Sequence, residues 1–193
     1  MEPDKLSSRE RLIRQGILEL EKTGPDGFSL RAVAAACGLS SAAPYKHFKD
    51  KDALLTAVAE AINQDWFERQ REALAQRSCT SDEKLRIICR EYLRFLREHP
   101  AFSAAVTRRE GASGRWLLDR LFDQSLTTLA VIDEHVAAHR IPPEDAYART
   151  FAIRTILYGA AIMAQSDSMA LTDRVLETVY GLIDNLISTP ADA

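Results

Sequence analysis

The chain has 193 residues, of which 46% are hydrophobic and 27% charged, and its formal net charge is −3. This length and apolar content suit one large or two small globular domains, while eight glycines and seven prolines are too few for a collagen-like or linker-like chain. No apolar run approaches the roughly 18 residues of a membrane-spanning helix, no signal peptide is evident, and three cysteines without CxxC spacing indicate reduced, mostly buried thiols, so we expect a soluble cytoplasmic protein without membrane contact.

Capping signals and apolar spacing predict helices along the whole chain and no strand. Capping boxes stand at Ser7–Glu10 and at Thr80–Glu83, and apolar side chains recur every three or four residues behind each start. The nine predicted helices run over residues 8–23, 30–37, 41–48, 51–75, 81–98, 100–106, 115–139, 142–165 and 173–188. The fold class is therefore all-α, and we expect two domains, over residues 1–51 and 52–193.

The stretch from Ser29 to Phe48 has the pattern of a helix-turn-helix motif. Ser29 can cap a short helix, and Gly38 is the residue best suited to the left-handed conformation that follows a helix. The second helix, capped by Ser40 or Ser41, would present small side chains, hydroxyls and hydrogen-bond donors, for which an apolar core has little use. Such a surface can enter a major groove about 12 Å wide.

These residues resemble the TetR family of transcriptional repressors. The matching blocks are Phe28–Ala34, Gly38–Phe48 and Lys49–Leu55, which contain the family's Tyr-x-His-Phe followed by Lys and Leu-Leu in the same order and spacing. Pro44 departs from the pattern, because the family more often has leucine there, but a proline within the first helical turn should cost little. The resemblance implies an N-terminal three-helix DNA-binding domain and a larger helical domain that binds a ligand and dimerises.

The resemblance also implies which residues contact DNA. Arg31 would reach a phosphate or a base edge, with guanine O6 and N7 as a bidentate partner, and hydroxyls and cations would reach phosphates. The expected DNA-contacting residues are Ser29, Arg31, Ser40, Ser41, Ala42, Ala43, Tyr45, Lys46, His47 and Lys51. Residues 1–55 hold nine Lys and Arg against eight Asp and Glu, so binding would depend on a local patch rather than on overall charge.

In the family, the second domain encloses an inducer pocket and forms a homodimer. Such pockets are mostly apolar, with a few polar groups that orient the ligand. The expected lining residues are Tyr92, Phe95, His99, Phe102, Trp116, Phe122, Phe151, Arg154 and Tyr158, with Gln165 as a further orienting group. For each of them, packing in the core is the alternative interpretation.

The last two predicted helices carry an apolar stripe broader than packing on one neighbour requires. Small residues in the first of them permit close approach of a second helix. The expected dimer-interface residues are Gly159, Ala160, Val175, Val179, Leu182, Ile183 and Leu186. The alternative is that both faces belong to the core of a single chain.

The function that the resemblance implies is a repressor without a cofactor or a metal ion. It would bind a palindromic double-stranded DNA operator as a homodimer and be released by a small apolar or amphipathic effector. Two alternatives stay open, a helical protein-binding adaptor and an enzyme in which His135 and His139, one helical turn apart, share a metal ion. Against the enzyme, Val136 stands where a zinc-protease helix has glutamate and no third ligand is evident, so we expect two exposed histidines.

Overall fold

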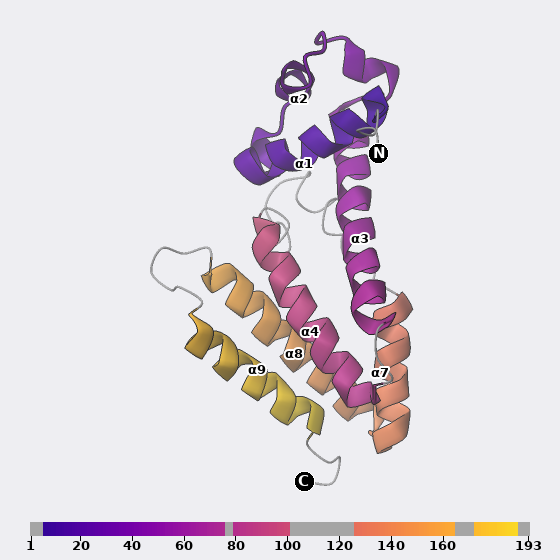
Figure 1. Ribbon diagram of the computed structural model, residues 1–193, viewed down its shortest axis with the longest axis vertical. Helices are drawn as coiled ribbons and strands as arrows, with labels where there is room; N and C mark the ends of the chain where they lie inside the picture. Colours follow the sequence, from indigo (N-terminus) through magenta and orange to yellow (C-terminus); the bar gives the residue numbers. More distant parts are fainter. Residues whose placement is uncertain (1–5, 76–78, 101–125, 165–171, 189–193) are drawn as a thin grey trace. The chain divides into compact units, whose positions relative to one another are not determined.

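A computed structural model of the chain describes residues 6–75, 79–100, 126–164 and 172–188 (Figure 1). Over these ranges the chain is all-α. The elements are α1 (Ser8–Gly27), α2 (Leu30–Ala36), the 3₁₀ helix η1 (Ala43–Lys46), α3 (Lys51–Ala75), α4 (Ser81–Glu98), α7 (Leu126–His139), α8 (Pro143–Met163) and α9 (Asp173–Ser188). The prediction of nine α-helices is wrong for this part of the chain, which holds seven, because the third is a 3₁₀ helix and residues 101–125 lie outside the described ranges. None of the described helices is long and apolar enough to cross a membrane.

The described residues group into two compact units. The first comprises residues 6–65, and the second comprises the later described residues, so that the sequence of α3 contributes to both units. Both predicted capping boxes are confirmed. The Ser7 hydroxyl accepts from the Glu10 N–H at 3.2 Å while the Glu10 carboxylate accepts from the Ser7 N–H at 2.8 Å, and Thr80 and Glu83 exchange the same two bonds.

The core of the first unit joins α1 to α2 and to the start of α3. Leu12, Val33 and Leu54 are all fully buried. The helix α1 comes close to α3 at Gly16, where a Cβ atom would lie 2.6 Å from Val58 Cγ2 and 3.8 Å from Leu54 Cδ1. Near its C-terminal end α1 is interrupted by Gly24, whose φ of 67° lies in the left-handed region. The predicted stop at residues 24–27 is thus a kink followed by one more turn.

We expect Gly16→Ala to lower the free energy of unfolding by about 1–3 kcal/mol, because the branched Val58 side chain has little freedom to move away. This cost exceeds the gain of up to about 1 kcal/mol in helix propensity. Urea unfolding followed by circular dichroism measures the change. A second substitution, Val58→Ala, should restore most of the loss in the double variant, whereas additive effects of the two substitutions would contradict the close contact.

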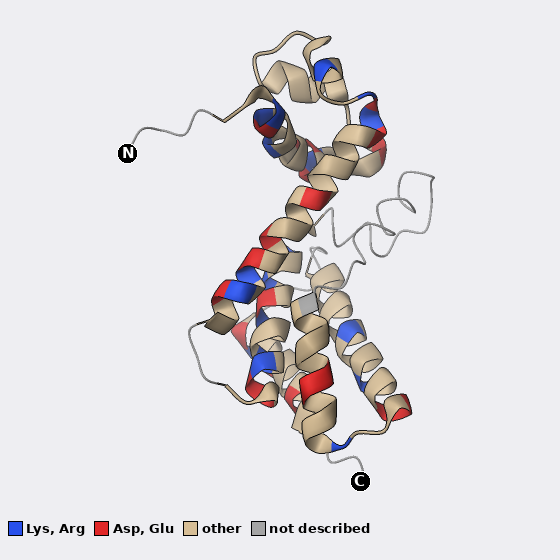
Figure 2. Ribbon diagram, turned by 90° about the vertical axis from the view of Figure 1, so that its right-hand side faces the viewer, with Lys and Arg blue, Asp and Glu red and all other residues tan. Residues whose placement is uncertain are grey.

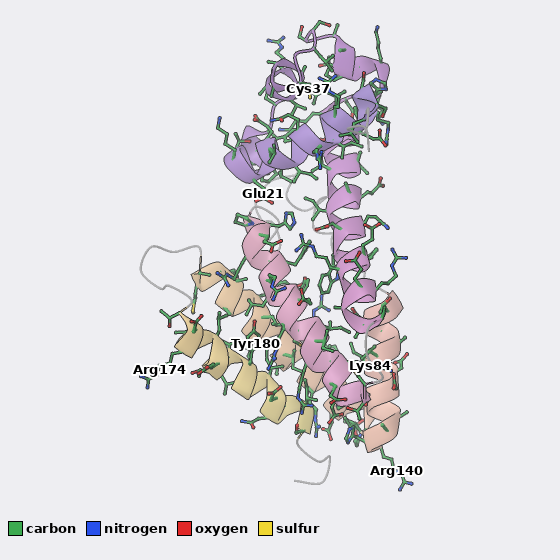
Figure 3. All side chains as sticks on the ribbon, viewed as in Figure 1. Glu21, Cys37, Lys84, Arg140, Arg174 and Tyr180 are labelled. Atoms are coloured by element: carbon green, nitrogen blue, oxygen red, sulfur yellow. The ribbon has the colours of Figure 1, made fainter. Side chains whose placement is uncertain are left out.

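In the second unit, α4 packs against α7, α8 and α9. Polar contacts accompany the apolar ones: Lys84 forms an ion pair with Glu134 of α7, and the Arg90 guanidinium lies 5.1 Å from the centre of the Tyr180 ring of α9. Figure 3 labels Lys84 on α4 and Tyr180 on α9. All three cysteines are free, as expected from their spacing, but only Cys89 is fully buried. Burial raises the pKa of the Cys89 thiol to about 12.

Candidate functional site

The turn after α2 is built by backbone hydrogen bonds around Gly38. The Gly38 N–H donates to the Ala35 carbonyl at 2.9 Å, and the Leu39 N–H donates to the Ala34 carbonyl at 2.9 Å, which is the Schellman pattern of helix termination. Gly38 has a φ of 68°, a conformation that disfavours side chains with a Cβ. At the other end, the Ser29 hydroxyl accepts from the Ala32 N–H at 3.4 Å. The predicted cap and turn of the motif are confirmed.

The second helix of the motif differs from the prediction because of Pro44. In an α-helix starting after Ser40, the residue-44 N–H would donate to the Ser40 carbonyl, and proline has no N–H to give. Instead the Ala43 N–H donates to the Ser40 carbonyl at 3.0 Å and the Tyr45 N–H to Ala42 at 3.3 Å, a three-residue spacing. No serine side chain caps this 3₁₀ helix. The expectation of an α-helix over 41–48 is therefore wrong, while Pro44 does lie in the first turn of the 3₁₀ helix.

The motif separates a buried side from an exposed side. Pro44 is buried, and Phe48 is 4% exposed with the Arg9 guanidinium 5.4 Å above its ring. Most of the side chains expected to contact DNA are exposed, namely Arg31, Ser40, Ser41, Ala42, Tyr45, Lys46 and His47. Ser29, Ala43 and Lys51 are half-buried. The Lys51 ammonium donates to the Asp26 carbonyl at 3.5 Å.

Charge on this unit is mixed, as its composition indicates. Figure 2 shows Lys and Arg in blue alternating with Asp and Glu in red on the helices of the first unit. Tyr45 is 59% exposed, so its ring and hydroxyl are open to solvent. The exposed side of the motif, defined here by Arg31, Ser41, Tyr45, Lys46 and His47, thus offers hydroxyls, cations and ring groups to solvent.

An aromatic cluster lies within the second unit, formed by Trp66, Tyr92, Phe95, His99 and Tyr158. Ring centroids are 4.8 Å apart for Trp66 and Tyr92, 5.5 Å for Trp66 and Phe95, and 4.7 Å for Phe95 and His99. The hydroxyls of Tyr92 and Tyr158 are hydrogen-bonded at 2.9 Å. Burial, with the neighbouring Tyr158, raises the pKa of Tyr92 well above its usual range, so this hydroxyl stays protonated and can serve as a donor.

The cluster unites four of the predicted pocket residues with Trp66, which sequence reasoning missed. Arg154 belongs to its edge, with its guanidinium 6.0 Å from the Tyr158 ring centre. Sequence reasoning also missed Gln70, a fully buried polar residue one turn after Trp66 on α3. The Gln70 amide donates to the Thr128 hydroxyl at 2.6 Å, and its carbonyl oxygen has no hydrogen-bond partner among the described residues.

The remaining predicted pocket residues divide into two groups. Phe151 is 63% exposed on α8, so the expectation that it points inward is wrong for the described chain. The other four lie outside the described residues, namely Phe102, Trp116, Phe122 and Gln165.

Exposed apolar side chains gather on α8 and α9. Tyr147 is 76% exposed on α8, and Leu182 and Val175 are 51% and 41% exposed on α9. Gly159, Ala160, Val179 and Leu186 are half-buried. Ile183 differs from the expectation for an interface residue, because it is 1% exposed and packs inside the unit together with Ile187.

Of the two histidines of α7, which were both expected on a solvated face, His139 is exposed but His135 is buried. His135 is 5% exposed, and its Nδ1 donates to Asp82 Oδ1 at 3.0 Å, while His139 Nε2 donates to the same oxygen at 2.7 Å. Burial lowers the pKa of His135 despite the nearby carboxylate. Burial opposes ionisation of Asp82, but its bonds to the two histidines outweigh that effect and hold its pKa below the usual range. Asp82 is thus a third metal-ligating side chain beside the two histidines, and the sequence spacing did not reveal it.

Comparisons with known proteins match both parts of the chain. Residues 12–58 match the family of bacterial regulatory proteins called the tetR family, and residues 85–186 match the tetracyclin repressor-like C-terminal domain. Over 54 residues the chain is 43% identical to the tetracycline repressor protein class C of Escherichia coli. That match covers 28% of this chain and 25% of the repressor, so the chain spans a quarter of this relative's length.

Solved structures match over nearly the whole chain. A TetR variant from Acinetobacter baumannii AYE, in complex with minocycline, has a TM-score of 0.63 and 22% identity, with 95% of this chain and 96% of that chain covered. The transcriptional regulator FadR from Bacillus subtilis, in complex with stearoyl-CoA, has a TM-score of 0.69 and 17% identity over 92% of this chain and 97% of that chain. At these identities the likeness shows a shared fold. Because the C-terminal family model alone covers more than half of the chain, and the N-terminal model covers the helix-turn-helix motif, the chain belongs to the TetR family of bacterial regulators.

Proposed function

We propose that this chain is a ligand-responsive transcriptional repressor that binds a palindromic DNA operator as a homodimer. In this proposal residues 1–51 bind DNA, and residues 52–193 bind a small apolar or amphipathic effector and dimerise. The observation that carries it is the exposed side of the helix-turn-helix motif, where Tyr45, Lys46 and His47 face solvent while Pro44 and Phe48 hold the motif to the core.

The residues on that exposed side support two kinds of contact. Lys46, Tyr45 and His47 can donate to phosphate oxygens, which position a protein on DNA without reading its sequence. Arg31 can form paired hydrogen bonds to guanine, which do read the sequence. Because Ser29 already caps α2 and Lys51 already donates to Asp26, we propose a smaller part for these two side chains.

We expect Lys46→Ala to weaken binding to every DNA sequence alike and to reduce the slope of log affinity against log salt by about one. Arg31→Ala should cost about 1–3 kcal/mol on the preferred site and relax the preference at one base pair. The measurement is fluorescence anisotropy at several salt concentrations, on duplexes selected from random fragments by the unaltered protein.

The control for these two variants is Arg140→Ala, which removes an exposed cation after α7, outside the proposed interface, and should leave both affinity and salt slope unchanged. If Lys46→Ala and Arg31→Ala behave like Arg140→Ala, the protein does not use this surface for DNA. That result would favour the alternative of a helical protein-binding adaptor, which has the same fold but does not bind DNA.

The effector region that we propose is the aromatic cluster of the second unit. Its rings supply apolar surface, while the Tyr92–Tyr158 hydroxyl pair supplies polar groups, as ligand sites commonly do. Two proteins of similar fold were solved with minocycline and with stearoyl-CoA, and both ligands combine apolar and polar parts, which supports an amphipathic effector here.

For release from DNA, the effector must bind the DNA-incompetent arrangement more tightly than the DNA-bound one. Since α3 contributes to both units, we propose that it transmits the difference. Two recognition surfaces must meet major grooves about 34 Å apart, so a small tilt prevents simultaneous docking. The effector should therefore weaken operator binding without dissociating the dimer.

A further inference from the structure

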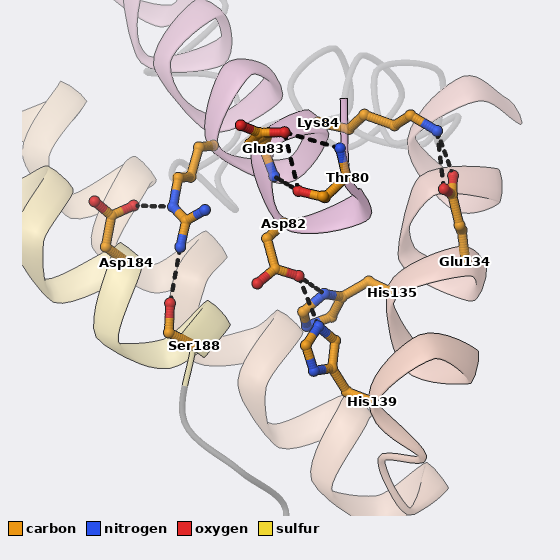
Figure 4. A network of polar contacts seen from close by, with 10 residues as sticks. Thr80, Asp82, Glu83, Lys84, Glu134, His135, His139, Asp184 and Ser188 are labelled. Carbon is orange, nitrogen blue, oxygen red and sulfur yellow. Dashed lines mark hydrogen bonds and ion pairs between the residues drawn. The ribbon is translucent and has the colours of Figure 1, made fainter. Parts of the chain in front are cut away.

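Asp82, His135 and His139 bring three metal-ligating groups together in the second unit, on two different helices. Asp82 is in the first turn of α4, and the histidines are one turn apart on α7. Figure 4 shows both imidazoles directed at the same carboxylate. One ligand atom from each of the three residues lies within 4.8 Å of the other two.

The donor set is the one that zinc and related ions prefer. Two imidazole nitrogens and a carboxylate oxygen form a common three-ligand set for Zn²⁺, with a fourth position left to water. Metal–ligand bonds of about 2.0–2.2 Å in a tetrahedron place neighbouring ligand atoms about 3.4 Å apart. The two histidine–aspartate contacts, at 3.0 and 2.7 Å, would therefore open by only a few tenths of an ångström when an ion replaces the shared protons.

The surroundings allow an ion to enter and to be held. The His135 side chain is buried and Asp82 is mostly buried, but His139 is 43% exposed, so solvent reaches the cluster from that side. The nearby Lys84 ammonium is paired with Glu134, which reduces its repulsion of a cation. The positive charge of Arg149 also acts on His135 and works against binding, which an ionised Asp82 offsets.

We propose that Asp82, His135 and His139 bind one divalent transition-metal ion of the zinc class, which links the start of α4 to α7. This site goes beyond the operator and effector functions and needs neither of them. The sequence alone predicted no metal site, because α7 supplies two donors and the third is 53 residues away in the chain. A bound ion stabilises the folded second unit, since the unfolded chain does not hold these donors together.

The test is titration of Zn²⁺ into the chelator-treated full chain, followed by calorimetry, with Co²⁺ absorption as a second readout. We expect one ion per chain, a rise in thermal midpoint with Zn²⁺, and the visible bands of a four-coordinate cobalt site. His139→Ala should weaken binding on the order of 100-fold and abolish the thermal shift. Because His139 is partly exposed, replacing it should disturb folding less than replacing the other two residues. Asp82→Asn provides an independent second variant.

The matched control is His47→Ala, an exposed histidine of the first unit, which should bind Zn²⁺ like the unaltered chain. The proposal is overturned if calorimetry shows no saturable binding of Zn²⁺ and the thermal midpoint does not change when Zn²⁺ is added. It is also overturned if His139→Ala and His47→Ala bind Zn²⁺ equally, since the cluster would then be a hydrogen-bonded link between two helices. Neither outcome bears on DNA binding, which is measured separately.

Discussion

Leu182→Arg should turn the protein into a monomer and weaken its binding to a palindromic operator by on the order of 100-fold or more. Leu182 is 51% exposed on α9, near Val175 at 41%, so arginine is tolerated in the single chain. A buried, unpaired charge within a dimer interface would cost several kcal/mol. Loss of the dimer then removes the linkage of two recognition surfaces, which contributes about 10²–10⁴ in effective affinity.

Sedimentation velocity measures the oligomeric state of this variant, and fluorescence anisotropy measures its affinity for the operator. Leu129→Arg on α7 is the matched control, because Leu129 is also an exposed leucine, at 37%, and lies on a helix outside the proposed interface. It should leave both readouts unchanged. A dimer that survives Leu182→Arg would place the interface on another surface of the chain.

Phe95→Ala should lower the free energy of unfolding by about 3–5 kcal/mol, the usual range for removing a buried phenylalanine ring. Phe95 is 0% exposed and contacts the rings of Trp66 and His99, while the Arg69 guanidinium lies 5.8 Å from its centre. Alanine would leave a cavity at the centre of the aromatic cluster. Urea unfolding followed by circular dichroism gives the change.

Phe95→Leu separates lost volume from lost ring contacts, since leucine refills most of the space. We expect about half of the alanine effect or less. Losses below 1 kcal/mol in both variants would mean that the cluster collapses around the gap. The leucine variant also tests the proposed effector region. An effector that packs on Phe95 should bind Phe95→Leu more weakly, while the self-association of the chain stays unchanged.

Local signals in the sequence predicted the helices well, and the reasons are local too. A capping box such as Ser7–Glu10 satisfies backbone N–H groups within one turn, and Gly38 ends α2 because its φ of 68° suits glycine. The prediction of an α-helix over residues 41–48 missed the 3₁₀ geometry, because Pro44 has no N–H to donate to the Ser40 carbonyl.

Contacts between distant residues were harder to predict. Asp82 was overlooked because nothing near it in the chain shows that two histidines of α7 lie opposite. Gln70 did leave a signal, since it occupies the next position of the four-residue spacing that runs from Leu54 to Trp66. A polar residue that continues an apolar stripe is a candidate for a buried functional group, and Gln70 is fully buried. The exposure of a side chain also could not be predicted without the fold. Phe151 and Ile183 both fit an amphipathic spacing, but Phe151 is exposed and Ile183 is buried.

Because apolar side chains are exposed on α8 and α9, the stability of the proposed homodimer should depend on the protein concentration. If the proposed homodimer forms through this face, Tyr147 and Leu182 leave water only when two protomers meet, so the thermal midpoint should rise as the solution becomes more concentrated. By the law of mass action, the dimeric fraction then falls on dilution. Under the proposed function, a cell that makes few copies would leave the operator vacant even without an effector.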